Sequence, residues 1–560
     1  MEVAVPETPP RFLSEEDLRR YVPVHVVWEI TLACDLKCLH CGSRAGHRRQ
    51  GELNTEECLK VVDALAQLGT REVSLIGGET YLRRDWIDII RAIRSHGMYC
   101  AIQTGGRNLT LDRLQEAIKA GLNGLGVSLD GLAPLHDRVR DVPGSFTHAV
   151  DTLRRARDAG LATSVNTQIG ADTMADLPGL MDTIIDLGAK QWQVQITVAM
   201  GNAADNDYLL LQPWRVLELM PLLARLYQEG ADRGLLMEVG NNIGYFGPYE
   251  HIWRGFGDER VHWSGCSAGQ TVLALEADGT VKGCPSLATI GFAGGNVRDL
   301  TLQEIWKSSK AIHFGRLRSV ADLWGFCQTC YYADVCRGGC TWTSHSLLGT
   351  PGNNPYCHYR ALELQKKGLR ERVVKIREAA KESFAVGEFD LITERISDGA
   401  LVASTASSKR PVKVREHGIG TDLPLEGRVP PKLDLCRVCN CYLGSTEITC
   451  PHCGADVQAA AVAYEADRRR RGAIISEIER QLEKKLSVVS SQSKNHIRRS
   501  PQCRGARAEK RLSALQFARI ERGLLLVARS CPGSSATAGC DAYYHVHCGG
   551  SARKETRCYK

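Results

Sequence analysis

The run Val24-His-Val-Val-Trp-Glu-Ile-Thr31 is followed, after Leu32-Ala33, by Cys34-Asp-Leu-Lys-Cys38-Leu-His-Cys41. The apolar run predicts a buried strand, and the CxxxCxxC cluster would lie in the loop at its carboxyl end. Ligand sites of parallel sheets collect at that edge. Three thiolates on one loop can hold three irons of a cubane cluster, which usually has four Cys ligands. One iron would then be open to a substrate or cofactor, although a fragment of a zinc site has similar spacing.

The first 200 residues alternate between apolar runs and amphipathic helical patterns. Asn54 or Thr55 can cap the first helix and Gly69 can end it, and further helices are expected over 86–95 and 173–187. Repeated βα units imply parallel strands with right-handed crossovers. They predict an α/β fold, an open partial (βα)6 barrel of the TIM type. The six predicted strands are 24–31, 72–76, 99–103, 124–129, 163–169 and 191–197.

Polar residues follow four of these strands, in register with the Cys loop. Taken singly, each is more often structural than functional, but together they predict a ligand site. Glycine allows a backbone to approach a ligand closely, and a carboxylate can accept hydrogen bonds. The four segments are Gly77-Gly78-Glu79, Gln103-Thr104-Gly105-Gly106, Ser128-Leu-Asp130-Gly131 and Asn166-Thr-Gln168.

The Cys spacing and these strand ends together resemble the radical SAM superfamily. In that family the open iron chelates the amino and carboxylate groups of S-adenosylmethionine. An electron from the [4Fe–4S] cluster then splits the sulfonium to give a 5′-deoxyadenosyl radical. The resemblance implies that Cys34, Cys38 and Cys41 are the catalytic cluster ligands.

The same resemblance implies that Gly77, Gly78 and Glu79 hold the methionine amino group. The family often has Thr-Asn-Gly where this chain has Thr104-Gly105-Gly106, so Gly105 departs from the pattern and Thr104 is left as the candidate contact. The remaining candidate contacts to the cofactor are Ser128, Asp130 and Asn166.

A second array of cysteines lies between residues 262 and 375 and resembles the SPASM domain of certain radical SAM enzymes. By that resemblance, two auxiliary [4Fe–4S] clusters are bound, one with four Cys ligands and one with three and an unknown fourth. A pair of zinc knuckles is the alternative. Aromatic residues such as Trp324, Tyr332 and Trp342 would shield the clusters from solvent. The first set is Cys327, Cys330, Cys336 and Cys357, and the second is Cys266, Cys284 and Cys340.

A third array predicts a small zinc ribbon. Two CxxC knuckles across a short hairpin are typical of a structural Zn²⁺ site, whose metal folds a module with little core of its own. Another iron–sulfur site is the alternative, and Cys441 or His452 could change the ligand set. We hypothesise that the ribbon and the helix after it recognise the substrate. The predicted ligands are Cys436, Cys439, Cys450 and Cys453.

The predicted domain organisation follows from these arrays and from shifts in composition. A helix is expected over 362–380, and the basic tail is expected to be mostly disordered. The segments are an N-terminal extension (1–20), the radical SAM core (21–205), a linker helix and loop (206–261), the SPASM domain (262–375), a linker (376–430), the ribbon (431–457), a helix (458–487) and the tail (488–560).

Composition narrows the class of protein. The 560 residues are 43% hydrophobic and 24% charged, which is ordinary for a globular protein. The net charge of +7 comes from residues 491–560, which hold 14 Lys/Arg and 4 Asp/Glu, so the body gives no electrostatic footprint for specific nucleic-acid binding. Neither an apolar run of about 18 residues nor a secretory signal is present, so we expect no membrane association. Tight groups among 22 Cys favour metal binding in a reducing, cytoplasmic compartment.

Proteins of the radical SAM/SPASM type mostly modify peptides or proteins. The resemblance therefore implies a peptide-modifying maturase of ribosomally made precursors, with a flavodoxin- or ferredoxin-type reductant as partner. A radical SAM enzyme acting on a small molecule, such as a cofactor precursor, is the alternative. A non-catalytic iron–sulfur or zinc scaffold is a more remote one.

Overall fold

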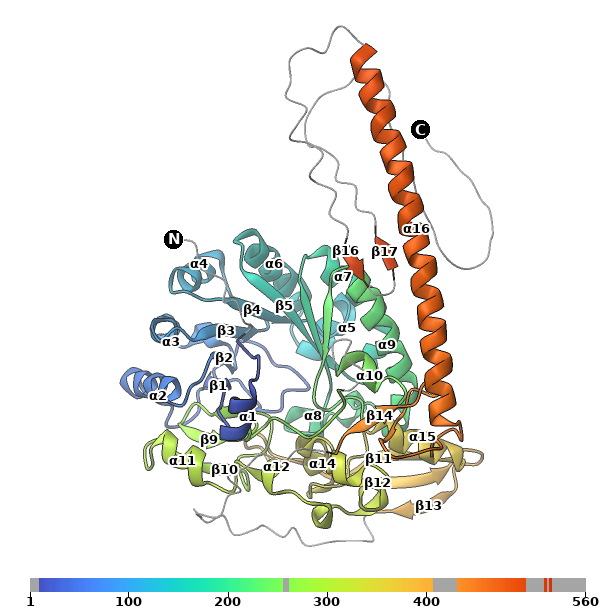
Figure 1. Cartoon of the computed structure of the whole chain (residues 1–560). Helices are drawn as coiled ribbons and strands as arrows, with labels where there is room; N and C mark the ends of the chain where they lie inside the picture. Colours follow the sequence, from blue (N-terminus) through green and yellow to red (C-terminus); the bar gives the residue numbers. More distant parts are fainter. Residues whose placement is uncertain (1–9, 255–260, 406–430, 500–517, 521–522, 526–560) are drawn as a thin grey trace. The chain divides into compact units, whose positions relative to one another are not determined.

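Eight parallel strands form the centre of the computed structural model, which describes residues 10–254, 261–405, 431–499, 518–520 and 523–525 (Figure 1). Six of them match the predicted runs. They are β1 (His25–Thr31), β2 (Glu72–Gly77), β3 (Tyr99–Thr104), β4 (Gly124–Ser128), β5 (Ala162–Ile169) and β6 (Gln191–Ile196).

The sheet is larger than the six predicted units. β7 (Leu236–Val239) pairs parallel with β6, and β8 (Val272–Leu275) pairs parallel with β1. β9 (Thr280–Lys282) and β10 (Ala293–Asn296) then continue the sheet antiparallel. Within the described residues the order runs from β10 through β1 to β7 without closing, so the barrel is open, as predicted.

Helices cover the outer side of the sheet (Figure 1). The first shows why they form where they do: Asn54 accepts from the backbone N of Glu57 at 2.9 Å, and Glu57 returns a bond to Asn54 N, which confirms the predicted cap. The covering helices are α2 (Thr55–Gln67), α3 (Trp86–Ser95), α4 (Leu111–Lys119), α5 (Ala133–Arg140), α6 (Ser145–Asp158), α7 (Thr173–Asp186) and α9 (Val216–Asp232).

The Cys-rich region is built from short helices and loops. Its compactness comes from packing rather than from long regular elements. Its helices are α11 (Leu302–Ser308), α12 (Phe314–Leu317), α13 (Ala333–Cys336), α14 (Thr341–Leu348) and α15 (His358–Lys366), while α1 (Glu15–Arg20), α8 (Asn202–Asp205) and α10 (Glu250–Trp253) are short helices elsewhere.

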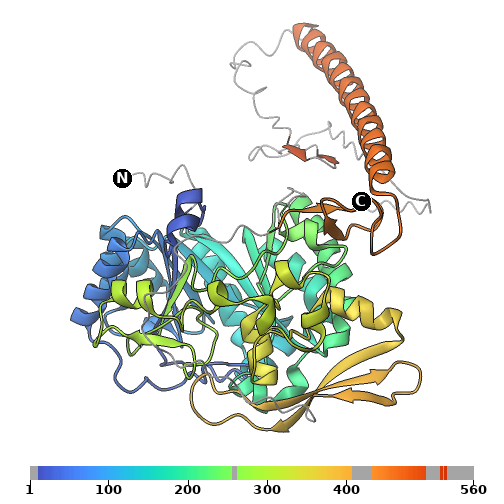
Figure 2. The ribbon, with the colours of Figure 1, turned by 60° about the horizontal axis from the view of Figure 1, so that its bottom comes forward.

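The helix expected over 362–380 is wrong beyond Lys366. Gly368 has a φ of +70° just after α15, and β11 (Leu369–Arg377) follows. β11 pairs antiparallel with β12 (Glu388–Arg395), and β12 pairs with β13 (Leu401–Ser404). The β-branched residues of β11 favour a strand, and its arginines pair with Glu394 across the sheet. The expected linker 376–430 therefore contains two strands, drawn in yellow to orange in Figure 2.

The ribbon has two short strands, β14 (Leu433–Leu435) and β15 (Tyr442–Gly444), and is followed by α16 (Val457–Arg499), which is longer than the helix predicted over 458–487. The chain divides into two compact units, Met1–Ile474 and Ile475–Lys560. Within the tail, β16 (Ala518–Ile520) pairs with β17 (Gly523–Leu525).

Some predictions fall on residues outside the described ranges. These are the disorder predicted for 500–517 and 526–560, most of the linker (406–430) and the first nine residues. Within the described part of the chain, the helices lack the combination of length and apolar character needed to cross a bilayer.

Candidate active site

The loop with Cys34, Cys38 and Cys41 lies at the carboxyl end of β1, in contact with the end of β2. Gly78 N donates to Thr31 O at 2.8 Å, and Glu79 N donates to Ala33 O at 2.7 Å. A Cβ on Gly77 would stand 1.9 Å from Thr31 O. The two glycines therefore let β2 pass directly against the start of the Cys loop, which brings Glu79 beside it.

The C-terminal end of α5 holds the middle of the loop. Leu39 N donates to Val139 O at 2.8 Å. Arg140 donates from Nη1 to Cys38 Sγ at 3.5 Å and pairs through Nη2 with Asp130 at 2.6 Å. His40, inside the Cys motif, places Nε2 2.8 Å from Asp130. The buried guanidinium of Arg140 and the buried carboxylate of Asp130 thus orient the Cys loop.

Glu79 is buried within 4.8 Å of the Cys34 thiol and the Asp35 carboxylate, measured between ligand atoms. It accepts hydrogen bonds from Thr104 Oγ1 and from Gly105 N, the latter at 2.6 Å. Burial raises the pKa of Glu79 to about 7 in spite of these bonds. Burial, with the Glu79 charge next in importance, raises the pKa of Cys34 well above its ordinary value. Both shifts come first from burial, so the Glu79 carboxylate and the Cys34 thiol lie in surroundings shielded from water.

Gly105 explains the departure from the family's Thr-Asn-Gly pattern. A Cβ at this position would lie 2.1 Å from Leu36 Cδ1 and 3.0 Å from Glu79 Oε1. Leu36 belongs to the Cys loop and is 4% exposed. The absent side chain thus allows the loop to close over the Glu79 carboxylate.

The other predicted contacts are divided between two kinds of environment. The Asp130 carboxylate is taken up by protein partners, because His40, Arg140 and the backbone N of Gln168 all bond to it. Asn166 on β5 donates across β4 to Gln103 on β3. Ser128 is partly exposed at the end of β4, and its side chain has no hydrogen bond to the described residues. Of these three, only Ser128 presents an uncommitted polar group.

The SPASM-type cysteines are buried or partly buried, and they act on one another within the two sets that the resemblance implies. Burial, then the nearby Cys357, Cys327 and Cys330 charges, raise the pKa of Cys336 well above its ordinary value. Burial, then the Cys340 and Cys284 charges, likewise raise the pKa of Cys266. The thiols within each set are thus near enough to influence one another's pKa, and their role as cluster ligands stays a prediction. We call the first group, Cys327, Cys330, Cys336 and Cys357, the four-cysteine site.

The geometry agrees with comparisons of the sequence. The family model of the radical SAM superfamily matches residues 28–184, and that of an iron–sulfur cluster-binding domain, SPASM, matches residues 266–331. This chain contains a radical SAM domain and a SPASM domain. These two domains indicate [4Fe–4S] clusters and binding of S-adenosylmethionine.

Several relatives resemble this chain over most of their own length. An AdoMet-dependent heme synthase of Methanosarcina barkeri is 27% identical over 60% of this chain and 97% of its own. The mycofactocin maturase MftC of Mycobacterium tuberculosis is 28% identical over 62% of this chain and 86% of its own. The PqqA peptide cyclase of Ruegeria pomeroyi is 29% identical over 62% and 91%. Among solved structures, SuiB of Streptococcus suis bound to S-adenosylmethionine is 16% identical, with a TM-score of 0.48 over 60% and 76%.

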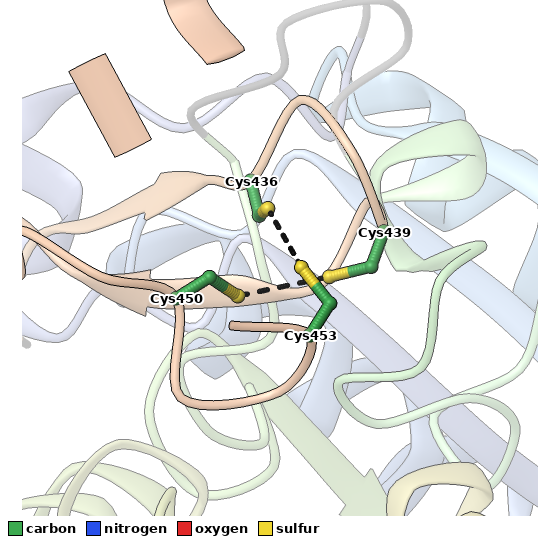
Figure 3. Close-up of side chains that lie close together, drawn as sticks. All are labelled: Cys436, Cys439, Cys450 and Cys453. Carbon is green, nitrogen blue, oxygen red and sulfur yellow. Dashed lines mark hydrogen bonds between the residues drawn. The ribbon is translucent and has the colours of Figure 1, made fainter. Parts of the chain in front are cut away.

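The chain carries one more group of converging thiols, in the ribbon (Figure 3). The Sγ atoms of Cys436, Cys439, Cys450 and Cys453 all lie within 4.8 Å of one another. Cys436 and Cys453 are 3.8 Å apart, as are Cys439 and Cys450. Zinc–sulfur bonds of about 2.3 Å in a tetrahedron give sulfur–sulfur edges of about 3.8 Å. The donor set therefore fits a single tetrahedral metal ion, and a cubane would need wider spacing.

Neither spare residue of the ribbon joins this group. Cys441 is buried but is not part of the converging set. His452 Nε2 faces Tyr332 and Tyr442 instead, at 2.8 Å from the Tyr332 hydroxyl and 3.0 Å from Tyr442 O.

Three residues near the Cys loop were missed from the sequence. Arg140 and His40 support the loop, and Tyr81 donates to the Asp35 carboxylate at 3.1 Å. His40 stands inside the CxxxCxxC motif, which could have marked it. Arg140 follows Ser-x-Asp-Gly on the next helix, and nothing in the local pattern shows that the helix ends against Cys38.

Proposed function

We propose that this enzyme reductively cleaves S-adenosylmethionine and uses the resulting 5′-deoxyadenosyl radical to modify a peptide or protein. The observation that carries the proposal is the arrangement of three Cys on one loop beside the buried Glu79 carboxylate. Three thiolates leave one iron of a cubane without a protein ligand. A carboxylate next to that iron is suited to an amino group with positive charge.

The residues at the site would divide the work as follows. Cys34, Cys38 and Cys41 would hold the cluster, and Glu79 would accept the amino group from a carboxylate already oriented by Thr104 and Gly105. Leu36 and Tyr81, both 4% exposed, would keep water from the reacting atoms. Ser128 is the free polar group that could reach the remainder of the cofactor.

The two further Cys sets support a substrate oxidation that returns an electron to the protein. The four-cysteine site would hold an auxiliary [4Fe–4S] cluster with all irons ligated, which suits an electron relay. Cys266, Cys284 and Cys340 would hold a second auxiliary cluster with one open position. A flavodoxin- or ferredoxin-type protein in the cytoplasm would supply the reducing electron. We assign zinc to the ribbon on the spacing of its four thiols.

Two kinds of substrate are compatible with this chemistry. Relatives named as a mycofactocin maturase and a PqqA peptide cyclase favour a peptide. Relatives named as AdoMet-dependent heme synthase, at similar identity and coverage, favour a small molecule as the second candidate. The SPASM-type cysteines do not distinguish a peptide substrate from a small molecule, so the substrate must be tested directly.

The first experiment gives reconstituted, reduced protein S-adenosylmethionine and measures 5′-deoxyadenosine. Release is expected, and its absence from protein with intact clusters would contradict both enzymatic assignments. Replacing Cys34, Cys38 and Cys41 by Ala should abolish release and remove about a third of the bound iron, because one cubane of three is lost. Unchanged iron would show that these cysteines are not ligands.

The second experiment distinguishes the substrates. A short reading frame beside the gene would be co-expressed with the enzyme, and its product would be examined for a change in mass. A modified peptide supports the maturase. Unmodified peptide, together with faster 5′-deoxyadenosine release on adding a tetrapyrrole precursor, would instead support the small-molecule enzyme.

A further inference from the structure

We infer that the ribbon is a metal-folded cover of the four-cysteine site, so that the ribbon's metal controls solvent access to that site. The inference rests on the proposed auxiliary cluster there, but not on the identity of the substrate. It is carried by three sets of contacts between the ribbon and the segments that bear the cysteines.

The first contact is made by His452, which stands between the ribbon ligands Cys450 and Cys453. Its ring faces away from the four ribbon thiols and lies among three tyrosines. Ring centroids are 5.2 Å from Tyr331, 5.6 Å from Tyr332 and 5.6 Å from Tyr359. The metal-binding knuckle thus presents an imidazole to the neighbouring domain.

The second contact connects the same knuckle to the chain segments of two Cys ligands. Tyr332 comes two residues after Cys330, and Tyr359 comes two residues after Cys357. The Tyr332 hydroxyl donates to Tyr442 O at 2.5 Å and lies 2.8 Å from His452 Nε2. The rings of Tyr332 and Tyr359 are 4.8 Å apart, edge to face. Both segments are therefore held against the ribbon.

The third contact is apolar. Leu433, Leu435 and Tyr442 of the ribbon hairpin belong to one buried cluster with Phe246 and Tyr332. Phe246 stacks on Tyr332 with centroids 4.0 Å apart, and Tyr442 is fully buried. Three members of the four-cysteine site pack against this cluster as partly buried neighbours; they are Cys330, Cys336 and Cys357.

A metal ion is needed to hold this cover in place. β14 and β15 have three residues each, which is too little hydrogen bonding for a hairpin to persist alone. The metal ligands instead fix both knuckles, and one knuckle places His452. Solvent exposure and hydrogen bonding around the sulfurs are among the factors that set the behaviour of an iron–sulfur cluster. Loss of the ribbon metal should therefore release the contacts with Tyr332 and expose the auxiliary cluster to solvent.

The contacts also limit how the ribbon can meet a substrate. Its inner face, formed by Leu433, Leu435, Tyr442 and His452, is already occupied by the chain itself. Val438 and Ile448 on the ribbon are 61% and 78% exposed and remain available. These two residues supply matched controls, because they belong to the same module without touching the aromatic cluster.

The test uses the full chain with Cys34, Cys38 and Cys41 replaced by Ala, so that only auxiliary iron is measured. We compare this background protein with three variants of it that carry His452→Ala, Cys439→Ser or Val438→Ala. The readout is the rate of iron release to a ferrous chelator from reduced protein under anaerobic conditions, with zinc content determined alongside. His452→Ala should keep its zinc and release iron about tenfold faster, as for loss of a residue outside the ligand shell. Cys439→Ser should lose zinc and show the same acceleration, and Val438→Ala should show neither change.

Unchanged iron release in His452→Ala would overturn the inference, even if Cys439→Ser failed to fold. Iron absent from the background protein itself would also overturn it, because no auxiliary cluster would be there to cover. Faster release in His452→Ala supports the cover whether or not the full enzyme cleaves S-adenosylmethionine. Failure of the cover is thereby separated from failure of the proposed function.

Discussion

Arg140 bonds to Asp130 at 2.6 Å with one guanidinium nitrogen and approaches Cys38 Sγ at 3.5 Å with another. Both charged side chains are buried, and Asp130 also bonds to His40 of the Cys loop. Although burial alone would raise it, the nearby Arg140 and His40 charges hold the pKa of Asp130 well below its ordinary value. One buried ion pair therefore fixes the end of β4 to the loop that carries Cys34, Cys38 and Cys41.

Replacing Asp130 by Asn should destabilise the metal-free protein by about 3–5 kcal/mol, because it leaves Arg140 buried without a counter-charge. The measurement is urea-induced unfolding of the apo-protein. Asp172→Asn is the control, since its pair with Arg138 has side chains that are 60% and 56% exposed and should contribute at most about 1 kcal/mol. Equal losses in the two variants would contradict a special role for the buried pair.

Replacing Gly105 by Ala should disturb the cover over Glu79. The added Cβ would meet Leu36 Cδ1 at 2.1 Å, so the buried Leu36 side chain must move, at a cost of about 1–3 kcal/mol. Iron incorporation and apo-protein unfolding are the measurements, and both should fall. Gly46→Ala, in the same loop, meets nothing within 4 Å and should change stability by less than about 0.5 kcal/mol. If Gly105→Ala behaves like Gly46→Ala, the loop does not close on Glu79 as described.

The sequence allowed prediction of the barrel because its signals are local. The run before Cys34 is apolar over a whole buried strand, and Asn54 with Glu57 forms a capping box that is visible in the letters. β7 and β8 were missed because four residues carry too little periodicity. β11 was mistaken for helix because its charges pair across a sheet rather than along a helix face.

In the candidate site, too, only part of the arrangement could be predicted from the sequence. The types of residue at the strand ends were readable, but the direction of each side chain was not. Asp130 turns to Arg140 at the end of the next helix, and Asn166 turns to Gln103 on β3; the local sequence shows neither contact. His452 looked like a spare metal ligand from its place between Cys450 and Cys453, and only the position of Tyr332 explains why it points elsewhere.

Glu29 should make stability depend on pH. The Glu29 side chain is 3% exposed, and burial raises its pKa to about 7. Arg49, whose guanidinium lies 2.9 Å from the Glu29 carboxylate, lowers this pKa, whereas the Glu276 charge raises it. A carboxyl whose pKa is raised in the folded state adds to the free energy of unfolding at a pH below its pKa in the unfolded chain, about 4.5. This stabilisation is lost as the pH rises to about 7. The loss is about 3 kcal/mol, at 1.36 kcal/mol for each pKa unit.

Unfolding of the apo-protein at pH 5 and pH 7.5 measures this effect. In Glu29→Gln, the free energy of unfolding should fall less between pH 5 and pH 7.5 than it does in the native chain. Glu56→Gln, at a carboxyl whose pKa is lowered by Lys60, should leave the decline between pH 5 and 7.5 as it is. A native-like slope in Glu29→Gln would show that another group titrates in this range.

Two truncations separate the ribbon from the second compact unit. A chain ending at Ile474, where the first unit ends, should keep its iron and its unfolding midpoint because the contacts with Tyr332 remain. A chain ending at residue 430 removes Leu433, Leu435 and Tyr442 from the aromatic cluster. Each large apolar side chain that loses its cover costs about 1.5–3 kcal/mol, so the shorter chain should be less stable by at least about 3 kcal/mol and should bind a hydrophobic dye. If the chain ending at residue 430 also retained full substrate turnover, the ribbon and α16 would have no part in substrate recognition.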